Sequence, residues 1–154
     1  MTNNGKKLLV ILLITGIMVQ IVVPGVLLGV VFGEREFQKN KKIKFFSNDN
    51  NYHHLKGKVE KFHKYYDYIL LSFYEIELFD KGLNYDSHDE YSIYSPDIEE
   101  TWKRLDLQTD LEICFIAAFQ TAKYSGFPIV QVSIDENEIL SFTEGKEALI
   151  KSLS

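Results

Sequence analysis

Residues 90–105, EYSIYSPDIEETWKRL, give the strongest indication of the architecture, because a short strand pattern changes there into a helical one. Residues 90–94 predict a strand. Ser95 and Pro96 predict the start of a helix, with Ser95 as the N-cap and Pro96 in the first helical position. Apolar residues then recur at spacings of four and three, which predicts one buried stripe. The stripe consists of Ile98, Trp102 and Leu105.

Two longer strands are predicted before this stretch. Residues 54–62 alternate loosely, and residues 67–79 are rich in aromatic and β-branched side chains. The apolar face of the second strand changes sides near Tyr74 and Glu75, which predicts a β-bulge. The polar residues 80–89, DKGLNYDSHD, are expected to form a loop.

Two further strands and a second helix are predicted after the first helix. Residues 111–119 and 129–134 have strand patterns and are separated by a loop. Residues 139–142 form a short extended piece. Thr143 is then expected to cap a C-terminal helix whose apolar side includes Ala148 and Leu149.

The predicted order is therefore three strands, a helix, two strands and a C-terminal helix. This order resembles the five-stranded OB-fold barrel, which carries a helix between its third and fourth strands. The resemblance covers about residues 52–142, and a meander sheet in a small α+β domain is the alternative. The barrel requires the third strand to pair with the second, and the first to pair with the second and fourth. Both folds predict a core of Val59, Leu71, Phe73, Ile93, Trp102, Ile113, Phe115, Val130, Val132 and Leu149.

An apolar segment precedes this mainly-β domain. Residues 8–32 contain 25 residues with Gln20 as the only strongly polar side chain. A membrane core of about 30 Å needs roughly 20 helical residues, so the segment predicts a transmembrane helix or uncleaved signal anchor. A cleaved signal peptide is the alternative, because Pro24 would leave a shorter apolar region. Residues 1–7 are then a short tail, residues 33–51 a polar, basic linker, and residues 52–154 a small acidic domain.

The orientation in the membrane is predicted from two opposing patterns. Lys6 and Lys7 before the segment are typical of an exported C-terminal domain. Five basic residues within 35–44 oppose this orientation under the positive-inside rule. We expect a single-pass cell-membrane protein with an extracytoplasmic C-terminal domain. Lysine outnumbers arginine 15 to 2, which is typical of an AT-rich bacterial genome.

Charge is distributed unevenly along the chain. Residues 1–51 carry 7 basic and 3 acidic side chains, whereas residues 52–154 carry 10 and 19. Nucleic-acid backbones are bound mainly through Lys and Arg, so an acidic domain makes nucleic acid an unlikely partner. The expected partners are the lipid bilayer, through residues 8–32, and a protein or carbohydrate ligand.

Two clusters contain side chains that bind metals in other proteins. The loop residues Asp86, His88, Asp89 and Glu90 lack the spacing of a calcium loop, so a solvated acidic loop is the preferred interpretation. The histidines His53, His54 and His63 flank the first strand, yet neighbours in a strand point in opposite directions. We therefore assign no metal, cofactor or catalytic residue.

Glu75 and Glu77 are the strongest catalytic candidates, because alternate residues of a strand share a face about 7 Å apart. That separation suits the carboxylate pair of a glycoside hydrolase. Two acidic residues that do not line a cleft, however, commonly lie on the solvent-exposed face of a sheet. Cys114 lies between apolar residues and is expected to be a small core residue. Aromatic rings able to stack on sugars, or to pack in the sheet, are Tyr65, Tyr66, Tyr68, Tyr74, Tyr91 and Tyr94.

These patterns favour a membrane-anchored, non-catalytic binding or interaction domain of unknown ligand. A hydrolase that uses Glu75 and Glu77 is one alternative. An accessory subunit of a membrane complex is another, because Gly25 and Gly29 have the spacing that permits close helix packing.

Overall fold

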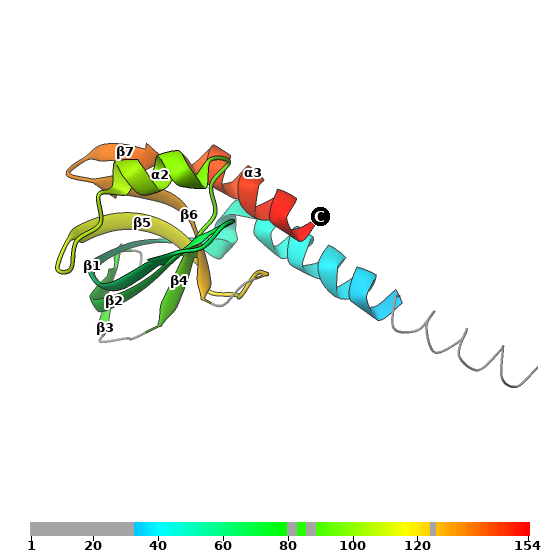
Figure 1. Ribbon diagram of the computed structural model, residues 1–154. Coiled ribbons are helices and arrows are strands. Elements are labelled where there is room, and N and C mark those ends of the chain that lie inside the picture. The colour runs from blue at the N-terminus through cyan, green and yellow to red at the C-terminus, as the bar shows by residue number, and fades with distance from the viewer. Residues whose placement is uncertain (1–32, 80–82, 86–88, 124–125) are drawn as a thin grey trace, which may run out of the picture. The chain divides into compact units, whose positions relative to one another are not determined.

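The computed structural model describes residues 33–79, 83–85, 89–123 and 126–154 (Figure 1). The predicted membrane segment, residues 8–32, and the tail before it lie outside these residues. Within the part of the chain that is described, no helix is long and apolar enough to span a membrane. The chain divides into two compact units between Asn40 and Lys41, and all the strands belong to the second unit.

In its described residues, the second unit contains seven strands, the helices α2 and α3, and the helical residues 41–47. A single 3₁₀ turn, η1 (Asp49–Asn51), leads into the first strand. The elements are β1 (Tyr52–Lys64), β2 (Ile69–Leu78), β3 (Leu83–Tyr85), β4 (Glu90–Ile93), α2 (Ile98–Leu105), β5 (Glu112–Ala118), β6 (Phe127–Ile134), β7 (Asn137–Leu140) and α3 (Phe142–Leu153).

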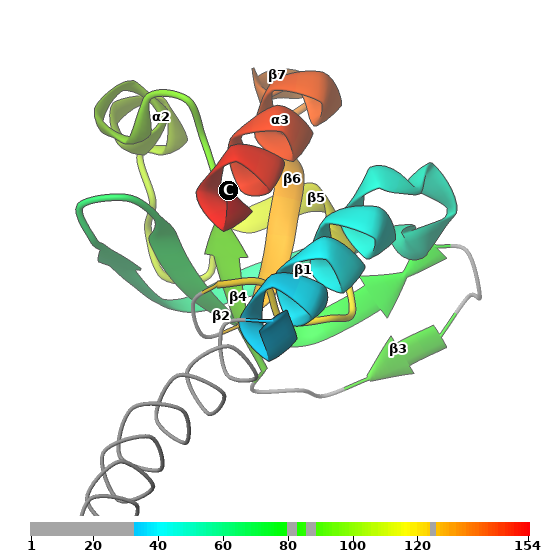
Figure 2. The same ribbon diagram turned by 90° about the vertical axis from the view of Figure 1, so that its right-hand side faces the viewer.

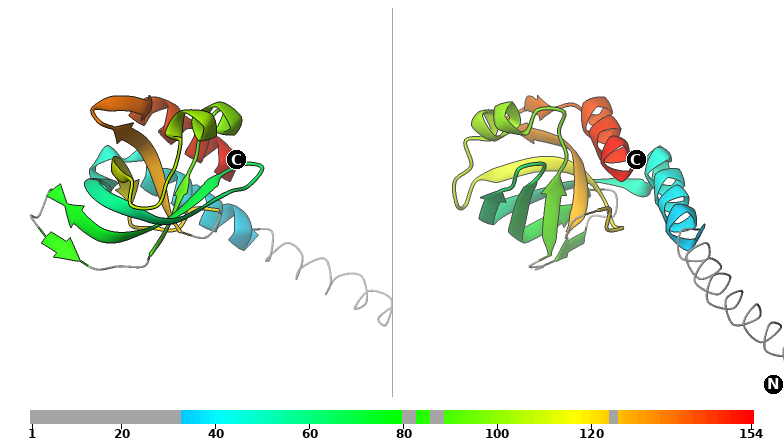
Figure 3. Two further views of the ribbon diagram at one scale, coloured as in Figure 1. Left: turned by 60° about the vertical axis from the view of Figure 1, so that its left-hand side comes forward. Right: turned by 45° about the vertical axis from the view of Figure 1, so that its right-hand side comes forward.

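Five of the strands form a closed barrel (Figures 1 and 3). Strand β1 pairs with both β2 and β5, and β2 also pairs with β4, all antiparallel. Strand β6 pairs antiparallel with β5 and parallel with β4, which closes the ring. The three pairings that we predicted are therefore confirmed, and an open meander with β1 at its edge is wrong.

The predicted β-bulge lies in β2. The register between β1 and β2 shifts so that Lys56 pairs with Glu77 but Lys58 pairs with Tyr74. Glu75 sits at the shift with φ 55°, a left-handed conformation. The extra residue explains why Phe73 and Ile76 both face the core although they are three positions apart.

Apolar side chains form two clusters. The first fills the barrel and includes Leu55, Phe73, Tyr91 and Phe115. The second lies outside the barrel beneath α3 and includes Phe46, Val130 and Leu149. Every residue of the predicted core is buried except Trp102, which is partly buried and packs against Phe62 with ring centroids 5.9 Å apart.

Both helices begin two residues away from the predicted positions. Asp97, rather than Ser95, caps α2, because its side chain accepts a hydrogen bond from the Glu100 N–H at 2.9 Å. The Ser95 hydroxyl instead lies 2.6 Å from that of Thr101. Ser141, rather than Thr143, caps α3 and forms a capping box with Glu144.

A strand and a helix occur in segments that we expected to be a loop and a linker. Strand β3 occupies part of the predicted loop 80–89 and pairs with β2. Residues 33–47, within the predicted linker, are helical, and the aromatic side chain of Phe46 is fully buried. The hydroxyl of Tyr52 donates to the Phe46 carbonyl at 2.8 Å. The compact unit therefore starts at Lys41, earlier than the expected boundary at residue 52.

Candidate functional site

Exposed aromatic side chains gather at the turn between β1 and β2. The Tyr65 N–H donates to the Tyr68 carbonyl at 2.9 Å, which closes the turn. The rings of Tyr65 and Tyr68 stack with centroids 4.5 Å apart, and His63 packs edge-on against Tyr65. Tyr66 is 99% exposed. We call His63, Tyr65, Tyr66 and Tyr68 the aromatic turn.

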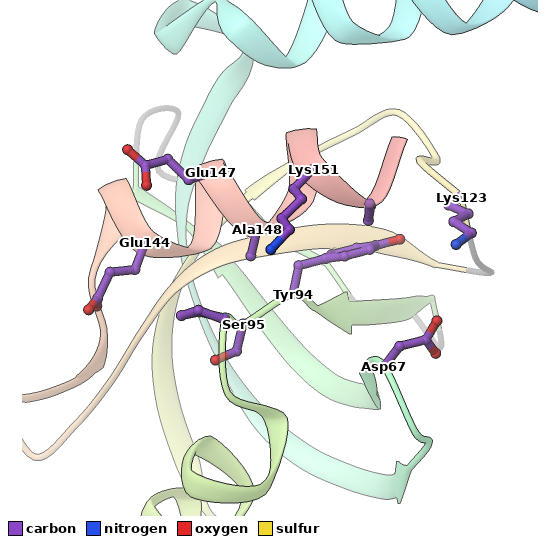
Figure 4. Close-up of a pocket in the computed structure, with 10 residues that line it drawn as sticks. Asp67, Tyr94, Ser95, Lys123, Glu144, Glu147, Ala148 and Lys151 are labelled. Carbon is purple, nitrogen blue, oxygen red and sulfur yellow. The ribbon is translucent and has the colours of Figure 1, made fainter. Parts of the chain in front are cut away.

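A hollow of about 680 Å³ adjoins this turn (Figure 4). Its walls come from the β1–β2 turn, the residues that follow β4, Lys123 after β5, and α3. We call it the α3 hollow. The side chains that matter below are Asp67, Tyr94, Lys123, Glu144, Glu147, Ala148 and Lys151.

Close packing holds α3 against the barrel beside this hollow (Figure 2). Gly145 lies so near β6 that a Cβ atom there would be 2.2 Å from the Val130 carbonyl oxygen. Leu149, one turn later, is fully buried. Tyr94 forms the floor and is only 2% exposed, so its ring is part of the domain's packing.

The charges around the α3 hollow have mixed signs. Figure 4 shows the Lys151 side chain extending from α3 so that its ammonium lies beside Ala148 and close to Tyr94, with Glu144 nearer the start of the helix. The Ser141 hydroxyl donates to Glu144 at 2.6 Å, and this hydrogen bond, with one from the Ser141 N–H, lowers the pKa of the carboxyl group. Glu144 is therefore ionised at neutral pH. Asp67 and Lys123 lie on the opposite rim.

A smaller hollow of about 200 Å³ lies on the outer face of β1, β2 and β4. Lys61 and His63 line it from β1, Ser72 from β2 and Glu90 from β4. Because His63 lines the small hollow and Asp67 lines the α3 hollow, both hollows adjoin the β1–β2 turn. One hairpin therefore brings exposed rings and both hollows together.

The histidines of the first strand do not form a metal site. His53 stacks on Phe119 with centroids 5.1 Å apart, His54 is exposed, and His63 contacts Tyr65. Among the described residues, no group of three His, Cys, Asp or Glu side chains has the geometry to hold a metal.

The predicted acidic loop is only partly described. Asp86 and His88 lie outside the described residues. Asp89 and Glu90 are both exposed, and Glu90 is the first residue of β4. The cation hypothesis for this loop therefore stays a prediction.

Glu75 and Glu77 lie away from the two hollows of the candidate site. The Lys58 ammonium binds the Glu75 carboxylate at 2.6 Å, and Glu75 occupies the bulge. Neither acid lines the two hollows described above. A carboxylate paired with lysine in this way is part of the sheet's charged outer face, so the geometry does not support the hydrolase alternative.

Cys114 is exposed, so its prediction as a core residue is wrong. The side chains of Ile113 and Phe115 point inward, and alternation along β5 directs Cys114 outward. Partial burial of the thiol still raises the pKa of Cys114, an effect that the neighbouring Lys56 ammonium opposes. An activated nucleophile needs a lowered pKa, so the raised pKa does not favour Cys114 as a nucleophile.

The other tyrosines serve packing. Tyr91 is fully buried in the barrel and meets Phe73, Phe115 and Phe127 edge-on. The Tyr74 hydroxyl donates to the Asp110 carboxylate on the sheet surface. Among the six tyrosines proposed for stacking, Tyr65 and Tyr66 of the aromatic turn are therefore the exposed ones, and Tyr68 beside them is partly buried.

Sequence reasoning missed the polar wall of the α3 hollow. Glu144, Glu147, Ala148 and Lys151 recur at spacings of three, one and three, which places them on one helix face. The spacing could be recognised in the sequence. The position of these residues beside Tyr94 could not, because it depends on contacts between parts of the chain that are far apart in sequence. Comparison with protein-family models, curated proteins and solved structures finds no match to this chain.

Proposed function

We propose that this chain is a membrane-anchored, non-catalytic binding domain of bacterial origin. Residues 8–32 serve as a single-pass anchor, and the barrel domain lies on the extracytoplasmic side. The length and apolar composition of residues 8–32 support the anchor. The ligand is a protein or a carbohydrate-like polymer, because the acidic barrel domain is unsuited to nucleic acid.

The strand order supports an OB-like assignment for the barrel. In that fold, strands 2 and 3 and the loops that follow strands 1 and 4 form the ligand face. Here those loops are the aromatic turn and the β5–β6 connection, and the small hollow lies over β2 and β4. The ligand face of an OB-fold therefore coincides with the candidate site.

The observation that carries the proposal is the exposure of Tyr66 beside the stacked pair Tyr65 and Tyr68. An exposed tyrosine on a short turn gains nothing from packing within its own domain. Tyrosine is instead common where proteins bind partners, because it offers a large rigid surface with a polar tip. The aromatic turn is thus the expected first point of contact with a ligand.

Photo-crosslinking of the full chain in its native cells tests this proposal. A benzophenone amino acid replaces Tyr66 in one variant and Lys103, an exposed residue of α2, in the control. We expect a discrete adduct of one mass from position 66, reduced by unlabelled full chain, and none from position 103. Mass spectrometry of the adduct distinguishes a protein from a glycan.

Equal labelling from both positions, or no adduct from position 66, would contradict a ligand surface at the aromatic turn. The fold of each variant is checked by circular dichroism in detergent micelles. Tyr66 is almost fully exposed, so the substitution is not expected to alter the domain.

A further inference from the structure

We propose that the α3 hollow binds a short peptide segment that carries a positive group and a carboxylate about three residues apart. The positive group lies near Glu144 and the carboxylate near Lys151. This inference rests on the proposed binding function and specifies the ligand chemistry of one part of its site.

The size of the hollow fits such a segment. Its volume of about 680 Å³ lies within the roughly 300–1,000 Å³ of small-ligand sites. Glu144 and Lys151 are separated by about 10 Å along the axis of α3, at 1.5 Å per residue. An extended peptide covers that distance in about three residues, at roughly 3.3 Å each.

The charges of α3 determine where the negative and positive groups of the ligand bind. Among the described residues, the Lys151 ammonium makes no hydrogen bond or ion pair, and Figure 4 shows it beside Ala148 and close to Tyr94. A ligand carboxylate there gains a charge-assisted hydrogen bond without displacing an existing partner. Glu144 is ionised, and Glu147 adds a second negative charge at that end. A cation is therefore favoured near the start of the helix.

Two other ligand classes fit the same walls poorly. A sugar needs an open aromatic face on which to stack, and the Tyr94 ring is only 2% exposed. A phosphate polymer needs a surplus of positive charge, whereas Asp67, Glu144 and Glu147 outnumber Lys123 and Lys151. The small side chain of Ala148 between the charged ends leaves room for a peptide's main chain.

Ligand-detected NMR titration of the full chain in detergent micelles tests this inference with three synthetic peptides. Acetyl-Arg-Ala-Ala with a free carboxylate is the probe, its amidated form lacks the anion, and acetyl-Gln-Ala-Ala lacks the cation. Empty micelles correct for partitioning. We expect the probe to bind at least roughly tenfold more tightly than either control peptide, the size of effect that one charged hydrogen bond gives.

Matched variants locate the contact. Lys151→Gln should weaken binding of the probe roughly tenfold but leave the amidated peptide unchanged. Glu144→Gln should weaken the probe similarly but not acetyl-Gln-Ala-Ala, and glutamine still satisfies the capping box of α3. Lys103→Gln, which removes a lysine from the last turn of α2, is the control and should change nothing.

Equal affinities for the three peptides, or equal losses in the Lys151 and Lys103 variants, would overturn the inference. No saturable binding of the probe at millimolar concentration would also overturn it. If the adduct from position 66 persists under any of these outcomes, the proposed function stands and only the assignment of the α3 hollow fails.

Discussion

Gly145 sets the distance between α3 and the barrel. A Cβ atom at this position would lie 2.2 Å from the carbonyl oxygen of Val130 and 2.8 Å from its Cα. Both are backbone atoms of a strand inside a closed barrel, so they cannot rotate away as a side chain would. The close approach brings the polar face of α3 beside Tyr94 and so creates the α3 hollow.

Gly145→Ala should therefore destabilise the domain by about 3 kcal/mol or more, because overpacking against fixed backbone is added to the loss of a well-packed interface. Urea denaturation followed by circular dichroism measures the change. Gly33→Ala is the matched control, since nothing lies within 4 Å of the added methyl group and alanine favours helix. Equal stability of the Gly145→Ala variant and the wild type would show that α3 does not pack as described.

The start of α3 illustrates a prediction at the level of one element. The Ser141 hydroxyl and N–H both donate to the Glu144 carboxylate, and these hydrogen bonds lower the pKa of Glu144. A lowered folded-state pKa means that the interaction stabilises the fold at neutral pH and loses this effect as the pH falls through that pKa. The stabilisation therefore disappears in acid.

Ser141→Ala should cost about 0.5–2 kcal/mol at pH 7, the usual range for an N-cap. The difference from wild type should shrink as the pH falls from the ordinary glutamate pKa of 4.5 through the lowered pKa of Glu144, because the neutral carboxyl group accepts these hydrogen bonds more weakly. Urea denaturation of both proteins in a pH series from 7 down to 2 measures this difference in the free energy of unfolding. Thr143→Ala, at the cap position expected from the sequence, should have a smaller effect. A larger effect from Thr143→Ala would mean that α3 begins there.

Strands with a clear alternation of apolar residues could be predicted from the sequence. Helix starts could not, because several neighbouring residues were equally able to cap each helix. The strands at residues 54–62, 67–79 and 111–119 were found because alternation with β-branched residues is strong there. Strand β3 was missed because its few residues stand among turn-forming residues. Both helix caps were misplaced because Ser, Asp and Thr occur within two residues and all can cap.

The candidate site could be predicted less well than the fold. The tyrosines of the β1–β2 turn were recognised, but sequence could not separate exposed Tyr66 from buried Tyr91. Cys114 was misplaced because the apolar residues around it suggested burial on both faces of a strand. The α3 hollow is formed by segments about 80 residues apart, such as Asp67 and α3. A periodic pattern in the sequence does not show that such distant segments lie together.

The whole molecule contains a larger folded unit than the strand pattern suggests. Phe46 is fully buried beneath α3, and the Lys42 ammonium donates to the Ala122 carbonyl at 2.5 Å. A fragment that starts at Lys41 keeps these contacts, whereas one that starts at Tyr52 loses them.

The fragment 41–154 should therefore be more stable than the fragment 52–154 by about 3–5 kcal/mol, the usual cost of removing a buried phenylalanine side chain. Thermal melts of the two fragments measure this difference, and Phe46→Ala in the longer fragment is the control that isolates the side chain. Identical melting temperatures would show that residues 41–51 contribute nothing to the folded unit.

The anchoring and orientation of the whole chain depend on residues 8–32, and Cys114 makes them measurable. It is the only cysteine, and it is exposed on the outer face of β5. Burial raises the pKa of the Cys114 thiol, so labelling is slow at neutral pH and accelerates as the pH rises. A charged maleimide that cannot cross membranes, applied at pH 8.5, therefore reports on which side the barrel lies.

The most direct measurement of a membrane-anchored, outward-facing domain is labelling of Cys114 in intact cells, followed by membrane fractionation. We predict that the labelled chain stays with the membranes after alkaline extraction, and that lysis before labelling adds little signal. A Cys114→Ser variant gives the background. Labelling that appears only after lysis would place the barrel in the cytoplasm, and release of the labelled chain into the soluble fraction would contradict the anchor.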